Sequence, residues 1–142
     1  MISVLGLDIG SKRIGVAGCD RTGLIATGLT TIDNKSFAHV TEQLRQIIRQ
    51  REVTLLVVGL PYTMDGALGS QARRVKKFTK RLAKTLELPV TYVDERLTSV
   101  EAEQQLSAER RNTAKNKGLI DKRAAAIILQ QWLDRSRVDQ CP

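Results

Sequence analysis

The stretch MISVLGLDIGSKRIGVAGCDRTGLIATGLTTI, residues 1–32, predicts how the chain begins to fold. Met1 to Ile9 is apolar on both faces, which is typical of a central strand. Gly10-Ser11 makes a turn, Arg13 to Cys19 is a second strand, and Leu24 to Ile32 is a third. Because both connections are short, the three strands are expected to form an antiparallel meander.

Helical and strand-like patterns alternate after the meander. A first helix is predicted with Asp33 or Asn34 as its N-cap, and a strand over Val53 to Leu60 follows it. A turn at residues 64–66 leads to a second helix, which Pro89 ends. The apolar positions of this second helix are Ala72, Val75, Phe78 or Thr79, Leu82 and Leu86.

The remaining chain is predicted to hold one more strand and two helices. Val90 to Val93 is the strand, Leu97 to Leu106 is a short helix, and Ser107 to Gly118 is a polar, mobile loop. Ile120 to Arg135 is the last helix. The order fits an α/β domain in which helices flank a five-stranded mixed sheet, an antiparallel meander joined by parallel strands. This is the element order of the ribonuclease H-like fold.

Length and composition favour a single folded domain. The chain has 142 residues, of which 42% are hydrophobic and 27% are charged, so it is globular rather than disordered. We expect one domain over residues 1–137 and a short tail over residues 138–142. No apolar run approaches the roughly 18 residues of a membrane span. No basic segment precedes the apolar N-terminus, so we expect a cytoplasmic protein without a membrane partner.

The charge balance favours a polyanionic partner. Lys and Arg total 23 against 15 Asp and Glu, which gives a formal net charge of +8. Nucleic acid is the simplest polyanion for such a chain. The single histidine, His39, excludes zinc sites built on several histidines, and two cysteines do not make a disulfide framework.

Acidic residues follow strands and precede a helix, where α/β proteins place ligands. Asp8 lies at the carboxyl end of the first strand, and Asp94 and Glu95 come directly after the Val90 to Val93 strand. Because side chains alternate along a strand, only one of Asp94 and Glu95 is expected to reach a site on a given face. Asp121 opens the last helix on the stripe of its apolar residues, so we expect it to point toward the sheet.

Three acids from distant parts of the chain are therefore expected to meet at one end of the sheet. Crowded carboxylates repel one another and need a cation, and hard oxygen ligands select Mg²⁺ or Mn²⁺. Two such ions about 3.5–4 Å apart activate a water and stabilise the leaving oxygen of a phosphodiester. Each acid also has a structural alternative: Asp8 as a turn cap, residues 94–95 as a solvated junction, and Asp121 as a partner of the helix dipole.

The second helix shows the strongest shift in composition. It carries seven cations and no acid from Arg73 to Lys84, which favours contact with the phosphate backbone of a nucleic acid. A solvated helix face is the alternative. Aromatic residues are few, so stacking platforms for single strands are poorly supported. The residues predicted to contact nucleic acid are Lys12, Arg13, Arg73, Arg74, Lys76, Lys77, Arg96 and Lys117.

Four stretches together resemble the YqgF family, also called RuvX. They are LDIGSKRIGVA at residues 7–17, VVGLP at 57–61 with MDG at 64–66, DERLTS at 94–99, and KGLID at 117–121 with Ala124-Ala125. The resemblance covers almost the whole chain. The combination of motifs is highly specific, although each motif alone is not.

The resemblance implies a compact, cytoplasmic, ribonuclease H-like nuclease. Members of the family are described as Holliday-junction-resolvase-like and as candidate nucleases for the 5′ end of pre-16S ribosomal RNA. Carried over to the matching positions, Asp8, Glu95 and Asp121 would be the catalytic acids that bind Mg²⁺ or Mn²⁺. Asp94 stays as the alternative to Glu95.

Other functions fit parts of the sequence. Resolution of four-way DNA junctions would use the same acids and usually needs a symmetric dimer, and the sequence leaves monomer and homodimer open. A non-catalytic RNA-binding module of ribosome assembly would keep the basic helix without needing the acids to converge. An actin-like ATPase fold also begins with a strand that ends in Asp-x-Gly, but it needs two domains and this chain has the length of one.

Overall fold

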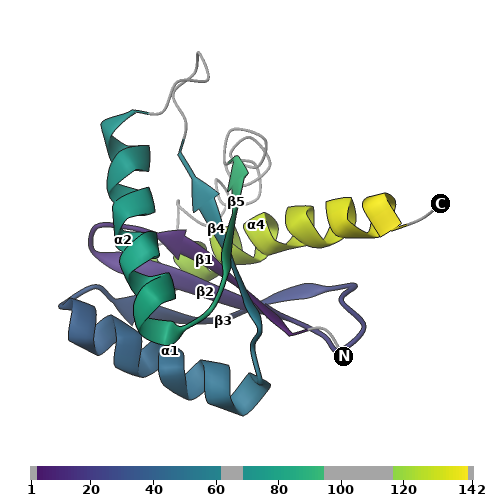
Figure 1. The fold of residues 1–142 in the computed structure, drawn as a ribbon, viewed down its shortest axis with the longest axis horizontal. Coiled ribbons are helices and arrows are strands. Elements are labelled where there is room, and N and C mark those ends of the chain that lie inside the picture. The colour runs from purple at the N-terminus through teal and green to yellow at the C-terminus, as the bar shows by residue number, and fades with distance from the viewer. Residues whose placement is uncertain (1–2, 62–68, 95–116, 141–142) are drawn as a thin grey trace.

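The computed structural model describes residues 3–61, 69–94 and 117–140 (Figure 1). The meander consists of β1 (Val4–Ile9), β2 (Arg13–Cys19) and β3 (Ala26–Asp33). The elements that follow are α1 (Phe37–Arg51), β4 (Leu55–Leu60), α2 (Ser70–Leu86), β5 (Val90–Asp94) and α4 (Lys117–Gln140). The predicted turn at 64–66, the helix at 97–106 and residues 107–116 of the predicted loop lie outside the described residues.

The strands form one mixed sheet of five strands in the order β3-β2-β1-β4-β5. β1 pairs antiparallel with β2, and β2 pairs antiparallel with β3. On the other side of the sheet, β1 pairs parallel with β4, and β4 pairs parallel with β5. The predicted sheet is therefore confirmed, and the carboxyl ends of β1, β4 and β5 share one edge.

Each face of the sheet carries its own apolar core. Leu5 and Leu7 of β1 belong to a cluster that includes Leu44 of α1 and Leu82 of α2. Val4 of β1 belongs instead to a second cluster, with α4. Alternation along β1 thus puts odd positions toward α1 and α2 and even positions toward α4. Figure 1 shows α4 crossing the sheet apart from α1 and α2.

α4 lies close to the sheet because β1 and β2 present glycines to it. A Cβ atom added to Gly6 would come within 2.6 Å of Leu129 Cβ, and one added to Gly15 would come within 2.0 Å of the Asp121 carbonyl oxygen. Neither position has room for a side chain. The glycines of β1 and β2 therefore fix where the start of α4 rests.

The N-cap of α1 differs from the prediction of Asp33 or Asn34. Ser36 is the cap, and its side-chain oxygen accepts a hydrogen bond from the His39 amide at 3.1 Å. Asp33 is still the last residue of β3, opposite Arg13, so the chain cannot turn into a helix there. Asn34 instead donates its Nδ2 to the Gly10 carbonyl at 2.9 Å and holds the β1–β2 turn.

The last helix is longer than predicted at both ends. α4 begins at Lys117 and ends at Gln140, so the predicted loop is wrong at residues 117 and 118. Gly118 falls in the first turn, where a residue of low helix propensity is tolerated better than in the interior. Among the described residues, no helix is both long enough and apolar enough to cross a membrane.

Candidate active site

Asp8 lies near the carboxyl end of the central strand and on the face that α4 covers. It is the register partner of Gly15 in β2, and its side chain is partly buried. Leu7 and Ile9, on either side of it, pack into the opposite core. Asp8 therefore sits at the edge predicted for a ligand site, with its side chain on the α4 face.

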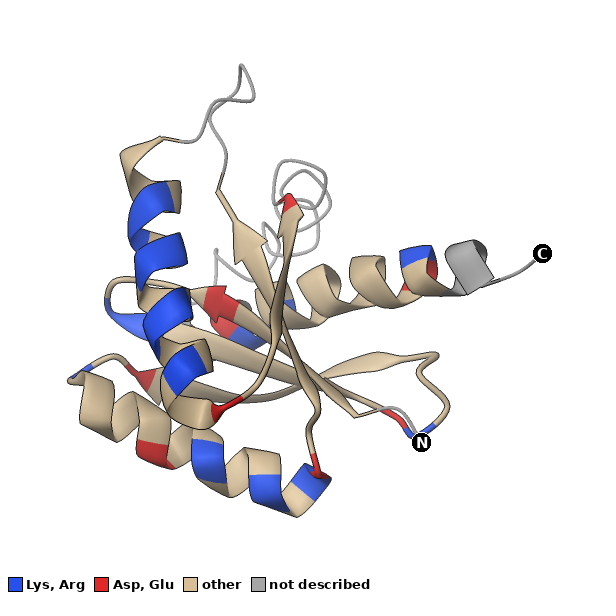
Figure 2. Cartoon of the chain, in the orientation of Figure 1, with Lys and Arg blue, Asp and Glu red and all other residues tan. Residues whose placement is uncertain are grey.

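Asp121 reaches the same place from the far end of the sequence. Its carbonyl oxygen lies over Gly15, the partner of Asp8. Its carboxylate Oδ2 accepts a hydrogen bond from Arg13 Nε at 2.8 Å, and the two side chains are only 25% and 31% exposed. The predicted orientation of Asp121 toward the sheet is confirmed. Figure 2 shows acidic positions at the end of β1 and the start of α4 close together.

The position of Asp121 within α4 weakens the helix-dipole interpretation. α4 begins at Lys117, so Asp121 lies in the second turn rather than at the start of the helix. The dipole effect falls off within the first turn. The ion pair with Arg13 of β2 is the interaction that the structure gives to this carboxylate.

The end of β5 places one of the two acids that the sequence left open, Asp94. Tyr92 packs against the α1/α2 core and Val93 belongs to the α4 core, so alternation places Asp94 on the α1/α2 face. Asp94 and Asp8 therefore lie on opposite faces of the sheet. Glu95 and Arg96 are outside the described residues.

Within residues 3–61, 69–94 and 117–140, no three His, Cys, Asp or Glu side chains gather as a metal site. Two of the three predicted acids, Asp8 and Asp121, fall in these ranges, and the third, Glu95, does not. The described residues thus bring two predicted acids to one face. Two carboxylates supply only part of the coordination shell that a hard divalent cation needs.

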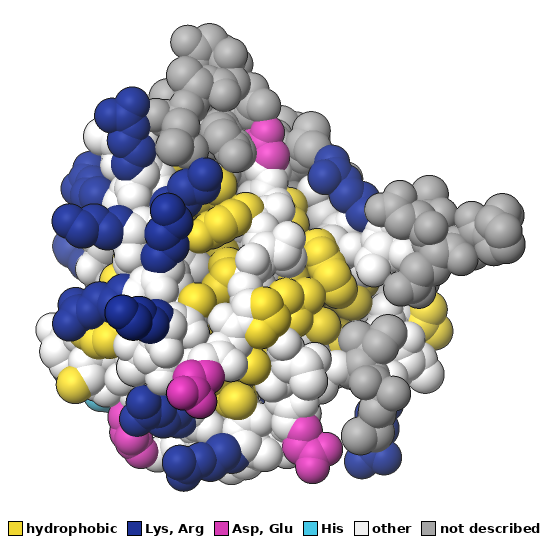
Figure 3. Space-filling view, viewed as in Figure 1, with side chains coloured by type: hydrophobic (Ala, Val, Ile, Leu, Met, Phe, Trp, Pro, Cys, Tyr) yellow, Lys and Arg dark blue, Asp and Glu magenta, His cyan; other side chains and the backbone are white. Residues whose placement is uncertain are grey.

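The cations of α2 form an exposed row, which we call the basic ridge. Its residues are Arg73, Arg74, Lys76, Lys77, Lys80, Arg81 and Lys84. All are exposed except the partly buried Lys76, whose Nζ lies 5.6 Å from the centre of the Tyr92 ring. The Arg81 guanidinium lies 3.9 Å from the centre of the Phe37 ring. Figure 3 shows dark blue side chains gathered along this helix.

The basic ridge and Asp8 lie on opposite faces of the sheet and approach one another at its edge. Arg74 of α2 lines a cavity of about 340 Å³ together with Gly10 and Ser11 of the β1–β2 turn. Gly10 is only two residues beyond Asp8. A nucleic acid that follows the first turns of α2 would therefore reach the carboxyl end of β1.

The other predicted contacts to nucleic acid differ in their surroundings. Lys12 is exposed in the β1–β2 turn. Arg13 is held by Asp121, a pairing that the sequence analysis missed because 108 residues separate the two. Arg96 lies outside the described residues, and for Lys117 the structure describes the backbone but not the side chain.

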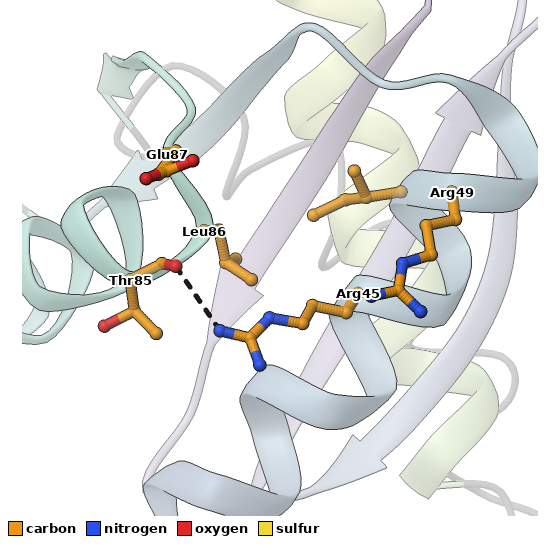
Figure 4. A pocket seen from close by; sticks show the side chains of 6 residues that line it. Arg45, Arg49, Thr85, Leu86 and Glu87 are labelled. Carbon is orange, nitrogen blue, oxygen red and sulfur yellow. Dashed lines mark hydrogen bonds between the residues drawn. The ribbon is translucent and has the colours of Figure 1, made fainter.

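A second cavity, of about 380 Å³, lies between α1 and the C-terminal end of α2 (Figure 4). Arg45 donates to the Thr85 carbonyl at 3.5 Å on one side, and Arg49 and Glu87 also line it. This cavity is at the end of α2 away from the β1–β2 turn. Its mixed charges make it a poorer anion site than the basic ridge.

Solved structures identify the class of fold. RuvC from T. thermophilus in complex with a Holliday junction substrate is similar, with a TM-score of 0.59 and 14% identity over 96% of both chains. Fowlpox virus resolvase in complex with Holliday junction DNA gives a TM-score of 0.51 and 8% identity, covering 95% of this chain and 99% of that one. These likenesses concern the fold alone. The chain has a ribonuclease H-like fold, as its element order predicts.

Sequence comparison identifies the family within that class. The RuvX family model, described as Holliday junction resolvase, matches residues 2–135. A protein of Trichormus variabilis named "Putative pre-16S rRNA nuclease" is 64% identical over 97% of this chain and 91% of its own length. One of Rippkaea orientalis with the same name is 65% identical over 96% of this chain and 98% of its own length. The chain belongs to the RuvX family, which its motifs predicted.

Proposed function

We propose that this protein is a divalent-metal-dependent endonuclease that hydrolyses phosphodiester bonds in the 5′ region of pre-16S ribosomal RNA. The observation that carries the proposal is that Asp8 and Asp121 share one face of the sheet: Asp8 pairs with Gly15, and the carbonyl oxygen of Asp121 lies over that glycine. The relatives named as pre-16S rRNA nucleases support the choice of substrate. Such an activity belongs to the bacterial cytoplasm.

The chemistry of the donor set fits a hard divalent cation. Asp8 and Asp121 offer carboxylate oxygens, the ligands that Mg²⁺ and Mn²⁺ prefer. Glu95 is the proposed third ligand, because Asp94 shares its strand face with Tyr92 and points away from Asp8. When bound, the cation would lower the pKa of a coordinated water and offset charge on the phosphate.

The remaining residues are assigned to binding and positioning. The basic ridge holds the phosphate backbone without reading bases, with Arg73, Arg74, Lys76 and Lys77 nearest the edge that bears Asp8. Lys12, Arg96 and Lys117 are proposed to extend this contact. Arg13 holds the carboxylate of Asp121 through its Nε and limits the orientations of that ligand.

Resolution of four-way DNA junctions is the second candidate. The description of the matching family model, Holliday junction resolvase, favours it. Such an enzyme needs two active sites that face the two strands to be cut, which a symmetric dimer supplies. A non-catalytic RNA-binding module is the candidate of another class, and it would bind RNA without cutting it.

The first experiment compares cleavage of precursor ribosomal RNA with cleavage of a four-way DNA junction in Mg²⁺. We expect the RNA to be cut by the wild-type protein and by Asp94→Asn, because Asp94 lies on the opposite face from Asp8. Asp8→Asn should lose cleavage by at least about a hundredfold, since a neutral amide is a poor ligand for a hard cation. Its RNA binding should stay within about twofold, because the phosphate contacts of the ridge are untouched.

Each competing function gives a different outcome in that experiment. Cleavage of the DNA junction alone would favour the resolvase. Binding of RNA without cleavage by any form would favour the non-catalytic module. Cleavage that survives EDTA, or that Asp8→Asn retains, would contradict the metal-dependent mechanism.

A further inference from the structure

The cavity beside the β1–β2 turn has a firm apolar wall. Ile9, Val75 and Phe78 form this wall, and Val75 is only 6% exposed. The ring of Phe78 meets the ring of Phe37 edge to face, with 5.9 Å between the centroids and an interplanar angle of 86°. Because neighbouring side chains hold this wall, the cavity is formed before any ligand arrives.

The polar rim of the cavity carries groups of two kinds. Asn34 and Gln71 have carboxamides, which both donate and accept hydrogen bonds. Arg74 brings an exposed guanidinium, which suits a phosphate. The position of Asn34 is fixed by two hydrogen bonds of 2.9 Å. Its side-chain Nδ2 donates to the Gly10 carbonyl, and its backbone N–H donates to the Lys12 carbonyl.

The location of the cavity ties it to the proposed active site. Ile9 follows Asp8 directly in β1, and alternation turns the two side chains to opposite faces of the sheet. A nucleic-acid strand that runs from the basic ridge across this edge of the sheet would reach the cavity just before it reaches Asp8. The cavity volume of about 340 Å³ accommodates one nucleotide rather than a duplex.

We propose that this cavity holds one unpaired nucleotide of the RNA, next to the phosphodiester at Asp8. The base lies against Val75 and Phe78, its edge faces the carboxamides, and its phosphate meets Arg74. Unpaired RNA bases are commonly splayed out and bound in this way, between an aromatic surface and hydrogen-bonding groups. The inference rests on the proposed function and deepens it: the substrate is structured RNA with an unpaired nucleotide beside the cut.

The test measures binding without added metal, so that its result does not depend on cleavage. The probe is an RNA hairpin with a single bulged 2-aminopurine, and the comparison is the same hairpin with an abasic residue at the bulge. The wild-type protein should bind the first about tenfold more tightly, within the range that stacking of one base on an aromatic ring supplies. Binding should also protect the 2-aminopurine from quenching by acrylamide.

Two matched variants locate the effect. Gln71→Trp fills the cavity from an exposed position of α2 and should remove the preference for the bulged base. Gln50→Trp makes the same change at an exposed position of α1 outside the cavity and should keep the preference. If Gln71→Trp does not fold, protection of the 2-aminopurine in the wild-type complex still decides the question.

Several outcomes would overturn this inference. They are equal affinity for the bulged and abasic hairpins, a probe that stays open to acrylamide, and equal discrimination by the two tryptophan variants. Saturable binding of free AMP or GMP without preference for the bulged hairpin would identify a small-molecule site instead. Absence of cleavage by a protein that still prefers the bulge would defeat the proposed nuclease and leave the cavity assignment standing.

Discussion

At the scale of single residues, the face that a side chain takes decides its possible chemistry. Asp8 lies near the carboxyl end of β1 and Asp94 at that of β5, at one edge of the sheet, yet alternation sends Asp8 toward α4 and Asp94 toward α2. Asp121 shares the face of Asp8 and is held by Arg13 at 2.8 Å. An acid at a strand end can thus share a metal site only with acids on the same face of the sheet.

Asp20 gives a prediction about a carboxylate that acts in folding rather than in catalysis. It begins the β2–β3 turn and accepts hydrogen bonds from the Ile25 amide at 3.0 Å, the Leu24 amide at 2.8 Å and the Thr22 hydroxyl. The bond from Ile25, followed by that from Thr22, lowers the pKa of Asp20 from 3.8 to about 2. NMR titration of the Asp20 carboxyl should find this value, and Thr22→Val should raise it.

The sign of the effect on stability follows from the lowered pKa. The folded chain favours the carboxylate, so the contribution of Asp20 is complete above its ordinary value of 3.8 and is lost as the pH falls toward 2. An Asp20 pKa near 3.8 in the folded protein would contradict this role for the turn.

At the scale of elements, glycines of the sheet determine where α4 packs against it. The Asp121 carbonyl oxygen occupies the space that a Cβ atom of residue 15 would need, at 2.0 Å. A backbone atom of a packed helix cannot move aside as a side-chain end can. The position of Asp121 relative to Asp8 therefore depends on a residue that carries no functional group.

Gly15→Ala should displace the start of α4. We expect a loss of about 1–3 kcal/mol in the free energy of unfolding, as for other overpacked cores, together with loss of cleavage. Chemical denaturation and the cleavage assay measure the two effects. Gly18→Ala, on the same strand, is the control, because its Cβ would come within 2.8 Å of Arg51 Nε, an atom of a flexible side chain. Equal stability and activity of the two variants would contradict the importance of the Gly15 contact.

The basic ridge gives a prediction about salt dependence. Changing Arg73, Arg74, Lys76 and Lys77 to glutamine should weaken RNA binding and flatten the plot of log affinity against log salt. The slope should lose somewhat less than about one unit for each phosphate contact removed. The control changes Arg21, Lys35, Arg49 and Arg135, which are exposed elsewhere and remove the same charge. An equal effect of both sets would show that net charge, rather than the ridge, governs binding.

Much of the element order was predictable because its signals are local. Turn residues and strand-like runs predicted the meander, and apolar spacing predicted α1 and α2. The cap of α1 was not predictable in the same way, because Asp33 is retained in β3 by its pairing with Arg13, and the helix begins only after Ser36. Local sequence shows that a residue can cap a helix and does not show that a sheet already holds it.

The candidate site was predictable only where its signals are local in the sequence. The position of Asp8 at a strand end and the direction of Asp121 follow from local periodicity. The Arg13–Asp121 pair and the contact at Gly15 join segments more than a hundred residues apart, which no local pattern reveals. The face of Asp94 follows from that of Val93, which only the packing of α4 supplies, and Glu95 stays a prediction because it lies outside the described residues.

At the scale of the whole molecule, the sheet separates Asp8 and Asp121 from the basic ridge. α4 covers the face that bears Asp8, and α2 with its basic ridge covers the other. This separation limits the pairing of the ridge with the acids, which would neutralise both. Within the part of the chain that the structure describes, the two approach one another at the edge near the β1–β2 turn, where Arg74 lines a cavity with Gly10, so we expect the nucleic acid to bend around this edge.

The most direct test of the shared metal site is Mn²⁺ binding followed by electron paramagnetic resonance. We expect the wild-type protein and Asp94→Asn to bind Mn²⁺ alike, while Asp8→Asn, Glu95→Gln and Asp121→Asn each weaken binding at least about tenfold. Circular dichroism should show all variants folded. Unchanged Mn²⁺ affinity in Asp8→Asn or Asp121→Asn would contradict a shared metal site, and loss of binding in Asp94→Asn with retention in Glu95→Gln would contradict the assigned third ligand.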